Sequence, residues 1–313
     1  MHDSVLPAIG NTPLVAIDRI AAGLPARVAV KLEYYSPGAS VKDRVARQIV
    51  EDAERSGRLK PGGTVVELTS GNMGIGLAIV CALKGYRLIA VMSEGNSVER
   101  RRVLEALGAT VELVPQVGSR QPGQVSSEDL RAVEARAEQL STELGAFRPD
   151  QFNNPSAIAA HETTGEEIWQ QTDGRTTHFV ASVGTGGTFV GVARALKRHN
   201  PAIRCYACEP ASAPFLAGGA ISNTRHKIQG TGYTLTPPLW ETGLVDGLLT
   251  ASDAEALTIA RRLAKQEGIL GGFSTGANVS AALKIAADAP RGSLVVTVAP
   301  DTGLKYFSTD LFE

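Results

Sequence analysis

Residues 178–199 read HFVASVGTGGTFVGVARALKRH, an apolar run followed by a glycine-rich turn and then a helical pattern. Glycines at the start of a helix expose backbone N–H groups, and the hydroxyls of Thr185 and Thr188 add donors, so the turn predicts a cradle for a phosphate group. It is not the dinucleotide-binding fingerprint, because Phe189 stands where that motif has its third glycine. It is not a P-loop either, because no Gly-Lys-Ser/Thr follows.

The same alternation of apolar runs and helical patterns extends along the chain. Short runs rich in β-branched residues lie at 28–33, 64–68, 87–92, 110–114, 178–183, 203–209 and 294–299. Alternation of this kind is typical of βαβ units with a largely parallel sheet. The length of 313 residues is roughly twice that of a usual domain, which favours two domains or one large α/β unit.

Two helices carry clear start signals. Ser126 with Asp129, and Ser252 with Glu255, each form the pattern of a capping box, and Gly268 is expected to close the second helix. The helix after Ser126 is expected to bury one face. That face consists of Leu130, Val133, Ala137, Leu140 and Leu144. Residues 116–127 before it are expected to form a surface loop.

The composition restricts the classes of function. Hydrophobic residues make up 43% of the chain and the net charge is −1, so there is no basic surplus for nucleic acid. The N-terminus does not have the pattern of a signal peptide, and no segment reaches the roughly 18 uninterrupted apolar residues of a membrane span. Cys205 and Cys208 are expected to be buried in a strand and to point to opposite faces, which disfavours a metal site. We expect a cytoplasmic protein with small-molecule partners and no metal.

A second strand-to-helix junction follows residues 64–68, where Thr69–Gly74 read TSGNMG and precede the helix IGLAIVCALKG. A helix N-terminus with hydroxyl and amide donors, but without a cation nearby, suits a carboxylate better than a polyphosphate. Two anion sites in one α/β protein suggest a phosphorylated cofactor beside a carboxylate substrate.

A third junction reads SPGASVKDR at residues 36–44. Ser40 is expected to cap the helix, and Val45 and Ile49 to form its inner face. Lys42 in the first turn is unusual, because the helix dipole disfavours a cation there and so favours the neutral amine. Such a lysine, if also desolvated, suits Schiff-base chemistry; the alternative is an ordinary surface lysine.

Residues 272–276 read GFSTG and match the nucleophile elbow of the α/β-hydrolases. That elbow requires a strand before it and a histidine after it. A helix and a short ILGG precede this segment, and the last histidine is His226. The sequence therefore disfavours a serine hydrolase.

Taken together and in order, these segments resemble the cysteine synthase and cystathionine β-synthase group, the fold type II enzymes that use pyridoxal 5'-phosphate. The resemblance covers nearly the whole chain. Its motifs are GNTPLV (10–15), SVKDR (40–44), TSGN-x-GIGLA (69–78), SVERRR (97–102), QFNNP (151–155), TTGEEIW (163–169), GTGGT (184–188), KIQG (227–230), G-x-S-x-G (272–276) and KYFSTDLF (305–312).

The resemblance implies two three-layer αβα domains with largely parallel sheets. A larger cofactor-binding domain would comprise 1–40 plus 148–313, and a smaller domain of residues 41–147 would move to close on the substrate. Lys42 would form the Schiff base. The cofactor would be held by Lys42, Asn72, Gly184, Thr185, Gly186, Gly187, Thr188 and Ser274. The substrate would be bound by Thr69, Ser70, Gly71, Asn72, Met73, Gln151 and Gly230.

The implied reaction is β-replacement on an activated L-serine, O-acetyl-L-serine or O-phospho-L-serine, through α-aminoacrylate, giving L-cysteine with sulfide. Met73 stands where cysteine synthases usually have threonine, and MSEGNS (92–97) replaces their usual M-P-E-x-x-S. A different donor or nucleophile, or cystathionine synthesis, therefore stays open.

Two other functions are compatible with the fold. A serine or threonine dehydratase shares the lysine but tends to have an all-glycine phosphate loop. A catalytically silent binding protein would have no reason to keep Lys42, Asn72 and Ser274 together. The resemblance implies a homodimer, whereas a complex with a serine acetyltransferase does not follow from the residues.

Overall fold

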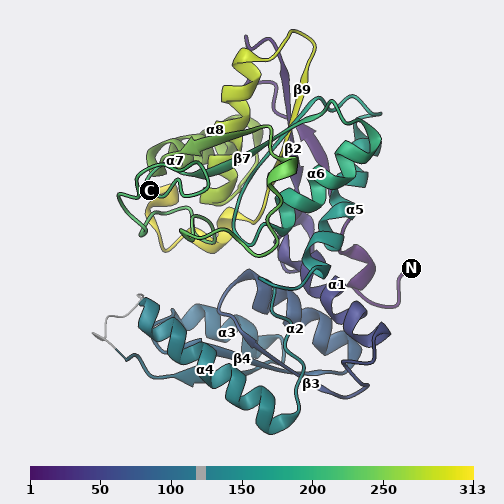
Figure 1. The fold of residues 1–313 in the computed structure, drawn as a ribbon, viewed down its shortest axis with the longest axis vertical. Coiled ribbons are helices and arrows are strands. Elements are labelled where there is room, and N and C mark those ends of the chain that lie inside the picture. Colours follow the sequence, from purple (N-terminus) through teal and green to yellow (C-terminus); the bar gives the residue numbers. More distant parts are fainter. Residues whose placement is uncertain (118–124) are drawn as a thin grey trace. The chain divides into compact units, whose positions relative to one another are not determined.

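The computed structural model describes residues 1–117 and 125–313 and divides into two compact units (Figure 1). Unit 1 comprises Met1–Ile9 and Lys42–Ser156, and unit 2 comprises Gly10–Val41 and Ala157–Glu313. Residues 1–9 and 148–156, expected in the larger domain, thus group with the smaller unit. Most of the loop expected at 116–127 lies outside the described residues.

Unit 1 is built on a parallel sheet in the order β3-β4-β5. Its strands are β3 (Thr64–Leu68), β4 (Arg87–Ser93) and β5 (Thr110–Val114), and its helices are α1 (Lys42–Arg55), α2 (Asn72–Lys84), α3 (Val98–Ala106) and α4 (Ser127–Leu144). Helices α2 and α3 connect successive strands, whereas the connection through α4 returns toward β3. Right-handed crossovers therefore place α4 on the face opposite to α2 and α3.

Helix α4 covers its face of the sheet with its central turns only. Val133, Ala137 and Leu140 pack with Val66, Ile89 and Val91. The expected ends of this stripe, Leu130 and Leu144, are instead 49% and 46% exposed. The reason is length, because a helix of 18 residues rises about 27 Å whereas a five-residue strand spans about 17 Å.

Unit 2 contains a six-stranded sheet in the order β1-β2-β9-β6-β7-β8, in which β1 is antiparallel to β2 and the other pairs are parallel. The strands are β1 (Leu14–Ala16), β2 (Arg27–Leu32), β6 (His178–Ser182), β7 (Arg204–Pro210), β8 (Gly247–Ala251) and β9 (Leu294–Ala299). The helices are α5 (Ser156–Gln171), α6 (Gly187–His199), α7 (Asp253–Arg262) and α8 (Phe273–Asp288).

Helices lie on both faces of this sheet (Figure 1). Val180 belongs to the core cluster that also contains α7 and α8 residues, whereas the ring of its neighbour Phe179 stacks against Phe189 of α6. Successive strand residues point to opposite faces, so α8 and α6 cover opposite sides of β6. The protein is therefore α/β with layered helices and largely parallel sheets, as expected.

Short helical turns complete the two units. They are η1 (Leu6–Ala8), η2 (Glu33–Tyr35), η3 (Thr242–Leu244), η4 (Leu263–Glu267), η5 (Gly303–Tyr306) and η6 (Asp310–Phe312). Helix α7 continues through η4, a π-helical turn, and Gly268 ends it with φ of 70°.

Both predicted capping boxes are present at Ser126 and Ser252. Helix α1 begins at Lys42, two residues after Ser40, which forms a β-bridge with Asp301. The capping role expected of Ser40 stays a prediction.

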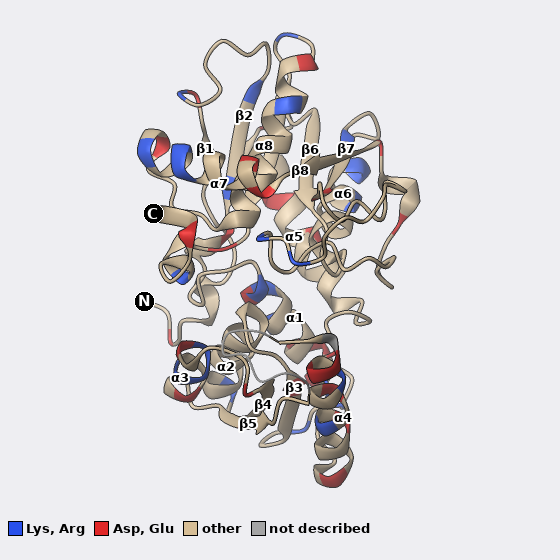
Figure 2. Ribbon diagram, turned by 90° about the vertical axis from the view of Figure 1, so that its left-hand side faces the viewer, with Lys and Arg blue, Asp and Glu red and all other residues tan. Residues whose placement is uncertain are grey.

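Charged side chains of both signs are spread over the helices of both units (Figure 2). Within the described ranges, no helix is long and apolar enough to cross a membrane, and no group of three or more His, Cys, Asp or Glu residues could hold a metal ion. Cys81, Cys205 and Cys208 are free and buried, and burial raises the pKa of each thiol to about 12.

Candidate active site

The predicted site residues divide between the two units. Unit 1 contains Lys42, Thr69–Met73 and Gln151, whereas unit 2 contains Gly184–Thr188, Gly230 and Ser274. Each half is built separately below.

In unit 1, Gly76 allows the first turn of α1 to approach α2 closely. A Cβ atom at Gly76 would lie 3.0 Å from the carbonyl oxygen of Lys42 and 3.0 Å from the Cβ of Ala46. Asn72 lies four residues before Gly76 and so projects from the same face of α2. The contact between α1 and α2 therefore brings the backbone of Lys42 to the helix face that carries Asn72.

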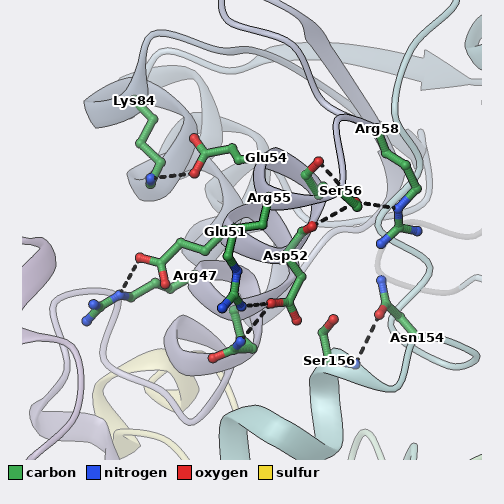
Figure 3. Close-up of polar contacts among 12 residues, drawn as sticks. Arg47, Glu51, Asp52, Glu54, Arg55, Ser56, Arg58, Lys84, Asn154 and Ser156 are labelled. Atoms are coloured by element: carbon green, nitrogen blue, oxygen red, sulfur yellow. Dashed lines mark hydrogen bonds and ion pairs between the residues drawn. The ribbon is translucent and has the colours of Figure 1, made fainter.

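Polar contacts fix the other end of α1 to α2 (Figure 3). Lys84, at the end of α2, donates to Glu54 over 2.8 Å, and the hydroxyl of Tyr86 donates to the other oxygen of Glu54 over 2.7 Å. Arg47 and Glu51 pair within α1 at 2.8 Å. Lys42 thus begins a helix whose other end is fixed to α2.

The segment Thr69–Met73 forms the start of α2. Among the described residues, Gly71 at the N-cap makes no side-chain capping bond, and a helix N-terminus of this kind suits an anion. A Cβ atom at Gly74 would lie 2.8 Å from Cγ2 of Thr69, so only glycine lets the loop fold back on its helix. Thr69 and Met73 are both buried.

Sequence reasoning missed a cation at this helix terminus. Nη1 of Arg100, on α3, lies 3.4 Å from the hydroxyl oxygen and 3.5 Å from the carbonyl oxygen of Ser70. The expectation of no nearby cation was wrong, because Arg100 is 30 residues away in the chain. In a parallel sheet, β3 and β4 end at the same edge, so the start of the helix after β4 meets the loop after β3.

Gln151 lies in a turn that follows a short extension of the sheet. Val65 of β3 forms a parallel β-bridge with Phe147, and Asp150 has φ of 44°. The buried side-chain oxygen of Gln151 has no hydrogen-bond partner in the part of the chain that the structure describes. This oxygen can therefore accept a hydrogen bond from a ligand.

In unit 2, the glycine-rich turn joins the end of β6 to the start of α6. Gly186 has φ of 90°, a conformation that favours glycine, and no side-chain capping bond satisfies the α6 terminus within the described chain. A Cβ atom at Gly184 would lie 2.2 Å from the carbonyl oxygen of Gly230. The turn therefore packs directly against Gly230, and Thr185 is buried.

The segment ending at Gly230 also contacts the start of α8. Oγ of Ser274 lies 3.5 Å from the carbonyl oxygen of Gln229, and Ser274 is 8% exposed. The glycine-rich turn, the Gln229–Gly230 segment and Ser274 are thus neighbours in unit 2.

The glycines around Ser274 serve helix packing. A Cβ atom at Gly272 would lie 2.4 Å from Oδ1 of Asp301, and one at Gly276 would lie 1.9 Å from the carbonyl oxygen of Ala256 in α7. Gly271, before the motif, forms only an isolated β-bridge with Thr302. The strand of a nucleophile elbow does not precede Ser274, which agrees with the sequence argument against a hydrolase.

Asn278 is a structural residue that the sequence did not reveal. Its Oδ1 accepts from the backbone N–H of Ser182 over 2.7 Å, and its Nδ2 donates to the carbonyl of Val298 over 2.9 Å. One turn after Ser274, α8 is therefore fastened to the ends of β6 and β9.

These donor sets fit pyridoxal phosphate. The buried, uncapped start of α6 and the hydroxyls of its turn suit a phosphate dianion. Ser274 offers a neutral hydroxyl for a ring nitrogen, and Lys42 offers the amine for a Schiff base.

Comparison with known proteins agrees with this geometry. The family model described as "Pyridoxal-phosphate dependent enzyme" matches residues 5–301. Cysteine synthases of Staphylococcus aureus are 44% identical over 312 residues, which is 99% of this chain and 97% of theirs.

Two solved structures are similar over the whole chain. O-acetyl serine sulfhydrylase isoform 3 from Entamoeba histolytica has a TM-score of 0.92 at 35% identity, covering 100% of this chain and 92% of that one. O-ureido-L-serine synthase has a TM-score of 0.89 at 42% identity, covering 100% and 95%.

Proposed function

The chain belongs to the family of pyridoxal-phosphate-dependent enzymes, and we propose that it replaces the β-substituent of O-acetyl-L-serine by sulfide to form L-cysteine. The observation that carries this proposal is similarity to cysteine synthases over 99% of the chain, together with a lysine at the start of α1 that packs beside the Asn72 face of α2.

Lys42 is the proposed catalytic residue. Pyridoxal phosphate, when bound, withdraws electrons from Cα of the amino acid, so that the α-proton and the β-substituent can leave. Lys42 would hold the cofactor through its amine, and the same amine, when free, would accept the α-proton. The same amine returns the proton to Cα after sulfide has added to Cβ.

The groups of unit 2 hold and tune the cofactor in this proposal. The N–H groups of Gly184–Thr188 and the hydroxyls of Thr185 and Thr188 bind its phosphate. Ser274 bonds the pyridine nitrogen. A neutral hydroxyl does not keep that nitrogen protonated as a carboxylate would, so the ring withdraws electrons less strongly and β-elimination is favoured over transamination.

The groups of unit 1 bind the amino acid. Its carboxylate is bound by N–H groups of the Thr69–Met73 loop and by the side-chain amide N–H of Gln151, and Arg100 adds a positive charge at the same terminus. Asn72 bonds the ring hydroxyl of the cofactor, and Gly230 contacts the substrate from unit 2. We also propose that unit 1 moves during turnover and excludes water from the reacting carbons.

The visible spectrum of the purified protein tests the cofactor, the lysine and the donor together. We expect a yellow band that shifts to longer wavelength on addition of O-acetyl-L-serine, and cysteine formation once sulfide is added. The matched control is Lys42→Ala, which should fold and lose the shift. If the wild-type band shifts with O-phospho-L-serine and not with O-acetyl-L-serine, O-phospho-L-serine is the donor. If the purified protein shows no cofactor band, the proposal that it is a pyridoxal-phosphate enzyme is refuted.

A second candidate reaction uses a different nucleophile. Its support is Met73, buried in the first turn of α2, and the 42% identity to O-ureido-L-serine synthase. An adaptable apolar side chain in place of a hydroxyl removes one polar donor beside the substrate. If the nucleophile that gives O-ureido-L-serine reacts with higher kcat/KM than sulfide, and Met73→Thr reverses that order, this second reaction is correct.

We further propose a homodimer that acts in the cytoplasm. The support is the resemblance, together with three free, buried cysteines, which suit a reducing compartment. Light scattering of the purified enzyme measures the mass directly. A monomer at micromolar concentration would contradict the dimer.

A further inference from the structure

A buried carboxyl group in unit 1 lies where the substrate loop and the Gln151 turn meet. Glu67 of β3 is 5% exposed, and its Oε2 accepts a hydrogen bond from the backbone N–H of Asp150 over 3.0 Å. Glu67 precedes Thr69 by two residues, and Asp150 immediately precedes Gln151. One side chain therefore links the strand that leads into the Thr69–Met73 loop to the turn that presents Gln151.

The bond from Asp150 to Glu67 follows directly after the backbone hydrogen bonds between Phe147 and β3. Phe147 donates to the carbonyl of Thr64 over 2.9 Å and accepts from Val66 over 3.0 Å. Three residues later, Asp150 is bonded to the Glu67 side chain instead. A main-chain group without a strand partner is thus held by a carboxyl from the sheet interior.

The backbone of Asp150 has an uncommon conformation. Its φ of 44° lies in the left-handed region, which is uncommon for residues other than glycine even though aspartate adopts it more readily than most, so bonds to its surroundings stabilise the turn. Its carbonyl accepts from the N–H groups of Asn153 and Asn154 over 3.2 and 3.0 Å. The turn is thus fixed on its far side by these bonds and on its sheet side by Glu67.

The charged groups that face Glu67 belong to the turn and to α4. They are Arg148, Asp150 and Glu134, and Arg148 pairs with Glu134 at 3.0 Å. On the neighbouring strand β4, Glu67 is paired with the uncharged Ala90. Burial raises the pKa of Glu67 to about 7. The strand neighbour of Glu67 thus supplies no positive charge, and within the described residues the carboxyl is hydrogen-bonded to the Asp150 N–H.

We propose that Glu67 is a positioning residue: through the Asp150 N–H it sets the direction of the Gln151 side chain and thereby the affinity for the substrate carboxylate. The inference rests on the proposed function, in which Gln151 binds that carboxylate. It assigns no contact between Glu67 and the substrate.

Two substitutions separate positioning from bulk stability. Glu67→Met keeps the length of the side chain and suits a buried strand, but it has no acceptor for the Asp150 N–H. Glu67→Gln keeps an acceptor oxygen and loses only the charge. We expect Glu67→Met to raise KM for O-acetyl-L-serine about tenfold with kcat within about threefold, because one bond of a buried group is lost. Glu67→Gln should stay within about threefold of wild type in both.

The matched control is Glu112→Met. Glu112 is a strand carboxylate of the same sheet, but it bonds the side chain of Arg136 instead of a turn backbone. This variant should leave KM unchanged. A purely structural role of Glu67 would reduce the active fraction and kcat, and Glu67→Gln would not rescue it.

Amide hydrogen exchange of the intact protein without substrate supplies a readout that does not depend on activity. The Asp150 amide should exchange at least about tenfold faster in Glu67→Met than in wild type or Glu67→Gln. Unchanged exchange and KM in Glu67→Met would overturn the proposal. A wild type that exchanges as expected but makes no cysteine would refute the proposed function and leave the Glu67 link standing.

Discussion

The contact between the glycine-rich turn and Gly230 makes Gly184→Ala a sensitive test of the cofactor site. The added Cβ would lie 2.2 Å from the carbonyl oxygen of Gly230, whereas ordinary contacts begin at 3.4 Å. The turn would therefore move by about 1.2 Å. The neighbour is backbone, so it cannot rotate away as a side chain could.

In the proposed cofactor site, a movement of this size would break a hydrogen bond from the turn to the cofactor phosphate. An N–H···O bond of about 2.9 Å would become too long to count as one. A charge-assisted bond contributes about 2 kcal/mol, which corresponds to roughly 30-fold in affinity. We therefore expect Gly184→Ala to bind pyridoxal phosphate about 30-fold more weakly than wild type.

The assay is a titration of cofactor-free protein with pyridoxal phosphate, followed by the absorbance of the bound cofactor. The matched control is Gly243→Ala, because a Cβ at Gly243 meets nothing within 4 Å in the described chain and its φ is not in the left-handed region. A Gly184→Ala affinity within threefold of wild type, or an equal loss in Gly243→Ala, would refute the reasoning.

Three further predictions concern packing, pH and thiol reactivity. Gly276→Ala places a Cβ 1.9 Å from the carbonyl oxygen of Ala256. The destabilisation by overpacking should exceed the gain in helix propensity by about 2 kcal/mol, so calorimetry should show a Tm about 3 °C lower than that of wild type. An unchanged Tm would contradict this prediction. Burial raises the pKa of Glu67 from 4.5 to about 7, so the folded protein binds the proton more tightly than the unfolded chain. Relative to Glu67→Gln, wild type should therefore lose about 3 kcal/mol of stability to urea as pH rises from 4.5 to above 7, and a parallel pair of curves would refute this. Burial raises the pKa of all three cysteine thiols to about 12. A disulfide reagent at pH 8 should therefore react at least about 100-fold more slowly with the folded than with the unfolded protein. A rapid initial reaction of the folded protein with the reagent would contradict this prediction.

Much of the fold was predictable because strands and caps depend on neighbouring residues. The runs at 64–68, 110–114 and 294–299 coincide with β3, β5 and β9. The edge strands β1 and β8 were not predicted. Strand β1 has only three residues, and β8 begins with a glycine and shows little alternation of apolar and polar residues. The strand conformation of each therefore depends on hydrogen bonds to its sheet neighbour.

The site was predictable where the motif residues are contiguous. The turn at 184–188 and the loop at 69–73 both begin helices, as their glycines indicated. Arg100 and Glu67 were missed because their partners, Ser70 and Asp150, lie 30 and 83 residues away. A period or a local propensity carries no signal over such separations.

The order of the two units' segments along the chain affects folding during synthesis on the ribosome. Residues 42–156 are one uninterrupted segment, so the sheet of unit 1 can form before the rest of unit 2 exists. Strand β2 (Arg27–Leu32) must instead wait for β9 (Leu294–Ala299), its parallel partner. At about 5–20 residues per second, this apolar strand emerges roughly 15–50 s before its partner. For most of translation, the nascent chain therefore carries an apolar strand near its N-terminus that chaperones can bind.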